Sequence, residues 1–206
     1  MQMRTWGCPN CCDIQSVLAA KSLLRSGAMF SGDQANYPEA AWIGRVLPND
    51  PGTATWNLKT LAGITVDNLS AAQISVLDAK KANYYVTIGG VNVTQNGNMA
   101  GGEWIDIVQA IDWLEARIQE DVYSALINVE KLPFTDAGIQ VVEGKVRGVL
   151  EAARKANIVA SYTVTVPKAA DVPQADRAAR ILTGVEFEAI LAGAVHKVKI
   201  DGFVSV

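Results

Sequence analysis

The feature that most constrains the fold of this chain is a pair of long amphipathic helical patterns joined by a short turn. In residues 101–129, apolar side chains recur three and four positions apart, which is the spacing of one helix face. This stripe consists of Trp104, Ile107, Val108, Ile111, Leu114, Ile118, Val122 and Ala125.

The second helical pattern follows Pro133, with Thr135 or Asp136 as its predicted N-cap. Its apolar stripe consists of Ile139, Val142, Val146, Val149 and Ala153. Three glycines weaken this helix by up to about 1 kcal/mol each relative to alanine, and we interpret them as sites of close helix approach. They are Gly138, Gly144 and Gly148. Because neither stripe carries a polar group suited to chemistry, we interpret the helix pair as a packing unit.

Alternation of apolar and polar residues predicts extended segments on both sides of the helices. These segments cover residues 55–67, 84–90, 158–166, 181–189 and 194–206. Asn96-Gly97 is predicted as a hairpin turn, because Asn-Gly favours the left-handed backbone that such turns need. Together these patterns predict an α+β fold, in which a mixed β-sheet is packed by the two long amphipathic helices.

Three shorter helices are predicted before the long pair. They cover residues 14–24, residues 39–46 after Pro38, and a segment that starts after the N-cap candidate Ser70. On the third helix, the residues expected to face inward are Ile74, Val76 and Leu77.

Composition excludes several classes of protein. Half of the 206 residues are hydrophobic and 19% are charged, which supports a folded core. The net charge is −3 and no broad basic field is present, so a nucleic-acid partner is not expected. No apolar stretch reaches the roughly 18–20 residues that span a bilayer, so no membrane partner is expected. We divide the chain into an atypical, poorly ordered leader (1–35), an α/β core (36–193) and a C-terminal strand or arm (194–206).

The cysteines do not indicate a metal site or a disulfide framework. All three, Cys8, Cys11 and Cys12, fall in the leader, so no distant cysteine is left to pair with them. A structural zinc site needs four ligands, and the single histidine, His196, lies nearly the whole chain away. We therefore expect no metal site and no cofactor, and we interpret the cysteines as exposed thiols.

The single histidine is predicted to pack or to make contacts, and not to catalyse. Alternation puts His196 on the same strand face as Val198 and Ile200, while Lys197 and Lys199 point the other way. A strand histidine with apolar neighbours is more often a packed or interfacial residue than a catalyst.

A pair of glutamates is the other candidate for chemistry. Glu186 and Glu188 share one strand face, with Arg177 and Arg180 as their expected partners. Paired carboxylates can do acid–base work, so an enzyme that uses these glutamates or Asp106 is one alternative. We favour a solvated or partner-facing edge, and we expect no enzymatic activity and no catalytic residue.

Several motifs occur together in the order and spacing of one known family. The residues that open the first long helix are Gly102, Trp104, Asp106, Asp112, Trp113 and Leu114, and residues 131–138 (KLPFTDAG) precede the second. Further matching segments are 83–86 (NYYV), 174–180 (QADRAAR) and 191–206 (LAGAVHKVKIDGFVSV). From about residue 30 onward the chain resembles the contractile tail sheath proteins of bacteriophages and prophages. The matching part is the C-terminal portion of those proteins, so we expect the chain to be a C-terminal piece.

The resemblance implies a virion structural protein. Sheath subunits stack as a helical tube around the inner tail tube, so the implied partners are other sheath subunits and the tail tube, with homo-oligomers in the full-length context. The implied location is the virion tail, after assembly in the host cytoplasm. Extended arms pair with sheets of neighbouring subunits, and the contact residues that we expect are Val195, His196, Val198, Ile200 and Phe203. A binding or adaptor domain that never polymerises is the other alternative.

Overall fold

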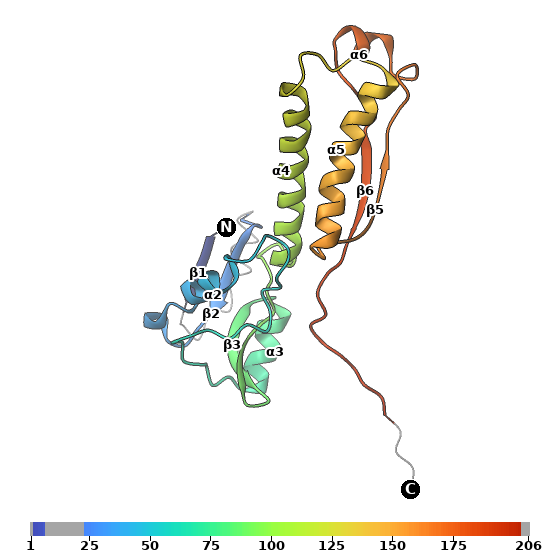
Figure 1. Ribbon diagram of the computed structural model, residues 1–206. Helices are drawn as coiled ribbons and strands as arrows, with labels where there is room; N and C mark the ends of the chain where they lie inside the picture. Colours follow the sequence, from blue (N-terminus) through green and yellow to red (C-terminus); the bar gives the residue numbers. More distant parts are fainter. Residues whose placement is uncertain (1, 7–22, 203–206) are drawn as a thin grey trace. The chain divides into compact units, whose positions relative to one another are not determined.

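The computed structural model describes residues 2–6 and 23–202, and it divides the chain into two units (Figure 1). Unit 1 contains Met1–Val108 and Ala194–Val206, and unit 2 contains Gln109–Gly193. Helix α4 (Ile105–Ile127) contributes its first turn to unit 1 and the rest to unit 2. Among the described residues, no helix combines the length and the apolar character needed to cross a membrane.

Unit 1 is built on a four-stranded mixed sheet. Its strands, in spatial order, are β1 (Gln2–Trp6), β2 (Ser26–Phe30), β3 (Asn83–Ile88) and β4 (Val91–Gln95). The first three run parallel and β4 is antiparallel to β3. Two of these strands come from the segment predicted as a leader. The cysteines and most of the predicted helix at 14–24 lie outside the described residues.

The β3–β4 hairpin turns at Gly89 and Gly90, so the turn predicted at Asn96-Gly97 is wrong. Both glycines have positive φ, +58° and +82°, which is the geometry of a tight two-residue hairpin turn. Asn96 and Gly97 also have positive φ, but they follow β4 and lead toward α4.

Three helical segments lie between β2 and β3. They are a 3-10 turn η2 (Gln34–Asn36), helix α2 (Pro38–Val46) and helix α3 (Ala71–Ala79). The predicted cap of α3 is confirmed, since Ser70 and Gln73 form a reciprocal capping box. On α3, Leu77 is buried but Val76 is 44% exposed, so the inward prediction for Val76 is wrong.

The segment predicted as extended at 55–67 is not a strand. Leu58 has a φ of +56°, which breaks an extended backbone. The segment still bonds to β4, because the Leu58 amide donates to the Thr94 carbonyl and the Thr94 amide donates to the Lys59 carbonyl, each at 2.9 Å. Within this segment, the Trp56 ring packs edge-on against the Trp42 ring of α2, with ring centroids 5.1 Å apart.

Unit 2 contains the two long helices and a two-stranded antiparallel sheet. Its further elements are α5 (Asp136–Lys155), β5 (Val159–Thr165), α6 (Gln174–Ala178) and β6 (Glu186–Leu191). β6 is shorter than the strand predicted from residue 181. The core of the unit consists of Ala110, Leu114, Val146, Val149, Leu150, Ala153, Ile158, Val159 and Val164. Figure 1 shows α4 and α5 beside the β5–β6 ribbon.

The α5 prediction is confirmed in its cap and its buried stripe. The Thr135 hydroxyl accepts the Gly138 amide, and every residue of the predicted stripe is buried. At Gly138 an added Cβ would collide with the Pro133 carbonyl oxygen. Gly144 and Gly148 face open space, so the prediction of close helix approach is wrong at these two positions.

The predicted α+β class, with a mixed sheet and two long amphipathic helices, is confirmed. The structure adds that the core around the long helices includes residues of a second, two-stranded sheet. This ribbon has one open edge on β6, since β6 pairs only with β5 among the described residues.

Candidate functional site

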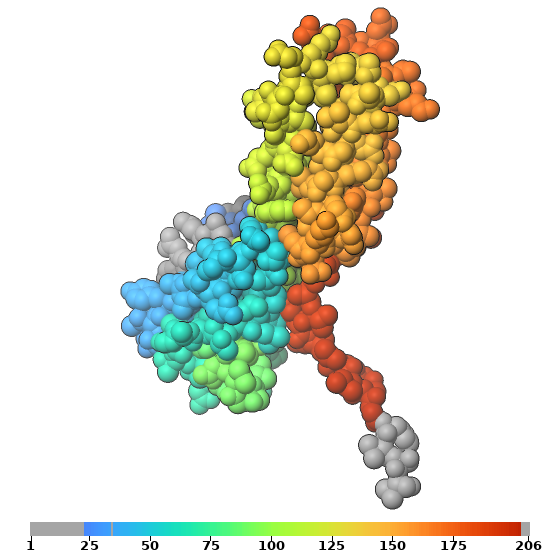
Figure 2. Space-filling view, in the orientation of Figure 1, coloured from blue at the N-terminus to red at the C-terminus, as the bar shows by residue number. Residues whose placement is uncertain are grey.

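The described part of the C-terminal segment, residues 194–202, is exposed and contains no strand. Val195, Val198 and Ile200 are 79%, 74% and 85% exposed, and the segment is uncovered along most of its length in Figure 2. The predicted strand is therefore wrong for these residues of the single chain, because a strand requires a hydrogen-bonded neighbour. Phe203 lies outside the described residues.

His196 is the one partly buried residue between 192 and 202. Its Nε2 lies 2.7 Å from the Thr55 hydroxyl, and its ring meets the Trp104 ring edge-on with centroids 4.6 Å apart. All three residues belong to unit 1. The contact therefore fixes the base of the C-terminal segment on its own unit.

Burial lowers the pKa of His196, and the positive charge of Lys59 lowers it further, whereas the Asp106 carboxylate opposes both effects. Burial also raises the pKa of Asp106, although the backbone amides of Asp106 and Ile107 and the charges of His196 and Lys59 act against the rise. Lys59 in turn has a pKa lowered by burial and by Arg45. This environment favours a neutral imidazole, which suits packing against Trp104.

The predicted carboxylate pair lies on an exposed strand face. Glu186 and Glu188 are both exposed on β6, opposite Thr165 and Thr163 of β5. In the described structure neither Arg177 nor Arg180 forms an ion pair with them, so the predicted partners are wrong. Within residues 2–6 and 23–202, no three His, Cys, Asp or Glu side chains lie close enough together to hold a metal ion.

The opposite face of β6 borders an apolar groove in unit 2. One cavity of about 450 Å³ is lined by Ile118, Val122, Leu126, Leu132, Pro133, Phe134, Gly138, Ile139, Val142, Val146, Arg180, Leu182, Val185 and Phe187. A second, of about 540 Å³, is lined by Ile111, Leu114, Glu115, Ile118, Gln119, Phe187, Ala189 and Leu191. Ile118 and Phe187 line both cavities, so the two adjoin, and together we call them the groove. It is bordered by β6, α4 and α5.

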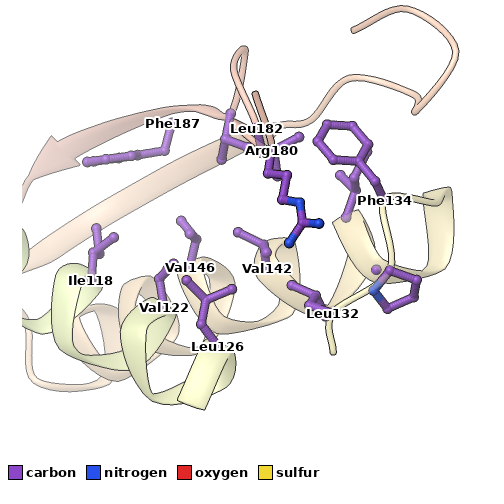
Figure 3. A pocket seen from close by; sticks show the side chains of 14 residues that line it. Ile118, Val122, Leu126, Leu132, Phe134, Val142, Val146, Arg180, Leu182 and Phe187 are labelled. Atoms are coloured by element: carbon purple, nitrogen blue, oxygen red, sulfur yellow. The ribbon is translucent and has the colours of Figure 1, made fainter. Parts of the chain in front are cut away.

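Arg180 is the cationic side chain in the groove lining, and Figure 3 shows it reaching in from the β6 side toward α5. The remaining lining is almost entirely apolar. The sequence placed Ile111 and Ile118 on an apolar helix stripe but did not predict the groove. Helical spacing identifies an apolar face, but it does not show which residues of that face are covered by another element. Ile111 is in fact exposed.

Residues 105–165 match the family described as E217 tail sheath protein gp31-like, C-terminal domain. The predicted resemblance to the C-terminal portion of phage tail sheath proteins is confirmed over these residues. The tail sheath match covers α4, α5 and β5, whereas β6 and the C-terminal segment lie beyond it. None of the curated proteins compared with the chain matches it.

Proposed function

We propose that the chain is a structural subunit of a contractile phage tail sheath, or the C-terminal fragment of one, and that it assembles through contacts between subunits. The match of residues 105–165 to a tail sheath family carries this proposal. A head-to-tail contact that does not close on itself produces an open helix, which is the geometry of a sheath. The partners are other sheath subunits and the tail tube, and the location is the virion tail after assembly in the host cytoplasm.

Strand addition is the contact that we propose between subunits. The C-terminal segment, 194–206, would add to the open edge of β6 in a neighbouring copy, so that main-chain hydrogen bonds supply affinity and side chains supply specificity. Two features support this contact, namely the exposure of Val198 and Ile200 and the apolar groove beside the open strand. Full burial of each such side chain contributes about 1.5–3 kcal/mol.

The expected contact residues have different parts in this proposal. Val198 and Ile200 enter the neighbouring groove, and Val195 lies at the start of the inserted segment. Because strand side chains alternate between the two faces, Phe203 would contact the neighbouring copy on the face of Lys197 and Lys199. His196, which packs on Thr55 and Trp104 of its own unit, holds the base of the segment. The function is mechanical and needs no bond chemistry, so Glu186 and Glu188 have no catalytic role.

Sedimentation velocity over a concentration series tests the proposal on the full chain and on a variant that lacks residues 194–206. We expect the full chain to self-associate with increasing concentration and the truncated chain to remain monomeric. Electron microscopy of the full chain should show helical or ring-shaped particles.

The matched variants are the double substitution Val198→Ser with Ile200→Ser, and the control Val76→Ser, which changes an exposed valine on α3. The double variant should weaken association and the control should not. Equal association with and without residues 194–206 would refute the arm contact. A full chain that is monomeric throughout would instead favour the adaptor alternative.

A further inference from the structure

The open strand β6 has two chemically different faces. Phe187, Ala189 and Leu191 line the apolar groove, whereas Glu186 and Glu188 lie on the exposed face. The register with β5 is consistent with this division, because Phe187 lies opposite the buried Val164. Successive strand residues point to opposite faces, so the two glutamates stand on one side of the ribbon, two residues apart.

The C-terminal segment has the same two-faced pattern with the opposite charge. Val198 and Ile200 alternate with Lys197 and Lys199. In the described residues, Lys199 has one contact with a carboxylate, a 3.9 Å approach to Asp201 in which both side chains are almost fully exposed. Such an exposed pair contributes little, so both lysines are available to a partner.

We propose that Lys197 and Lys199 of one copy pair with Glu186 and Glu188 of a second copy when the segment adds to the edge of β6. This inference rests on the proposed function and specifies the register of its contact. With Val198 opposite Phe187, the lysines and glutamates lie opposite each other on the outer face while the apolar residues face the groove.

The pairing holds for either strand direction, because both charged pairs have a spacing of two residues. An antiparallel segment places Lys199 opposite Glu186, and a parallel segment places Lys197 there. A shift by one residue would put the lysines over the apolar groove and the valine in solvent. The charge pattern therefore rejects the shifted register as well as favouring the matched one.

Charge reversal tests this pairing. One variant carries Glu186→Lys and Glu188→Lys, a second carries Lys197→Glu and Lys199→Glu, and a third combines all four changes. Opposite charges on facing strands attract and like charges repel, so each double variant replaces two attractions with two repulsions. We expect each double variant to raise the dissociation constant of self-association about tenfold or more, and the fourfold variant to return it to within about threefold of the wild type.

The control is Glu130→Lys with Asp171→Lys, which makes the same charge change at two exposed positions of unit 2 outside the groove lining. Sedimentation velocity at low salt and in 1 M NaCl measures all variants. High salt should reduce the differences, since the screening length falls to about 3 Å. If removing residues 194–206 abolishes association but the glutamate reversal behaves like the control, the pairing is refuted and the sheath proposal stands. A full chain that never self-associates overturns both.

Discussion

Asn83→Ala is the substitution that we expect to damage unit 1 most. Asn83 is the first residue of β3, and its side chain is completely buried, with an exposed fraction of 0%. Its amide group donates to the carbonyls of Ala28 and Asn98, at 2.8 and 2.9 Å. Its oxygen accepts the amides of Gly97 and Asn98, at 2.7 and 2.8 Å. One side chain thereby ties β2 to the loop that leads into α4.

The size of the effect follows from these four bonds. A typical hydrogen bond contributes about 0.5–1.5 kcal/mol net, so the loss of all four costs about 2–6 kcal/mol before any cavity is counted. A small domain is stable by about 5–15 kcal/mol, so much of the stability of unit 1 is at stake. Asn83→Asp keeps both acceptor contacts but loses both donors and buries a charge, so it should be at least as harmful at neutral pH.

Urea denaturation followed by tryptophan fluorescence measures this cost, because Trp42 and Trp56 lie in the core of unit 1. The matched control is Asn92→Ala on β4, an exposed asparagine that accepts one hydrogen bond, from the Thr87 hydroxyl. We expect the control to cost less than about 0.5 kcal/mol. If Asn83→Ala costs no more than the control, the buried amide does not hold the loop and the reasoning is wrong.

Two further outcomes follow from the structure. Gly144→Ala and Gly148→Ala should each stabilise α5 by up to about 1 kcal/mol, because an added Cβ meets nothing there. Gly138→Ala should destabilise α5, because its Cβ would collide with the Pro133 carbonyl oxygen. Thermal denaturation measures these changes, and a lower melting temperature for Gly144→Ala would contradict the first prediction. Proton NMR of the single histidine should give a pKa below 6.5 for His196 and a still lower one in Asp106→Asn, since burial lowers it and Asp106 raises it. Because the undocked imidazole binds a proton more readily, packing on Trp104 should be strongest above pH 6.5 and weaken as the pH falls below it; a pKa at or above 6.5 would contradict this.

The long helices could be predicted from the sequence because their signals are local. The Thr135 cap and the apolar stripe of α5 act within the helix itself, and both are confirmed. The same holds for the Ser70 capping box. Signals of this kind depend on residues three or four positions apart, so a single sequence contains all the information they need.

The failed predictions depend on contacts between distant residues. Asn96-Gly97 and Gly89-Gly90 both have left-handed backbones, and each satisfies the local rule for a hairpin turn. The choice between them depends on a partner outside the turn, since Asn83 at the start of β3 accepts the amides of Gly97 and Asn98 and holds this loop beside its own strand. Leu58 likewise takes a left-handed backbone where its segment bonds to β4. The residues next to Leu58 in the sequence do not predict this conformation.

The error at the C-terminal segment has a different cause. The alternation of Val198 and Ile200 with two lysines is typical of a strand, yet the described residues form none. Strand patterns select residues that fit a sheet, but the hydrogen bonds belong to a pair of strands and not to one. Exposing a regular apolar alternation is unfavourable to a subunit that stays alone. The open edge of β6 has apolar residues on one face and glutamates on the other, and its main chain lacks a second strand partner among the described residues. Pairing of the two between copies accounts for both features at once, whereas a monomeric function leaves each without a physical reason.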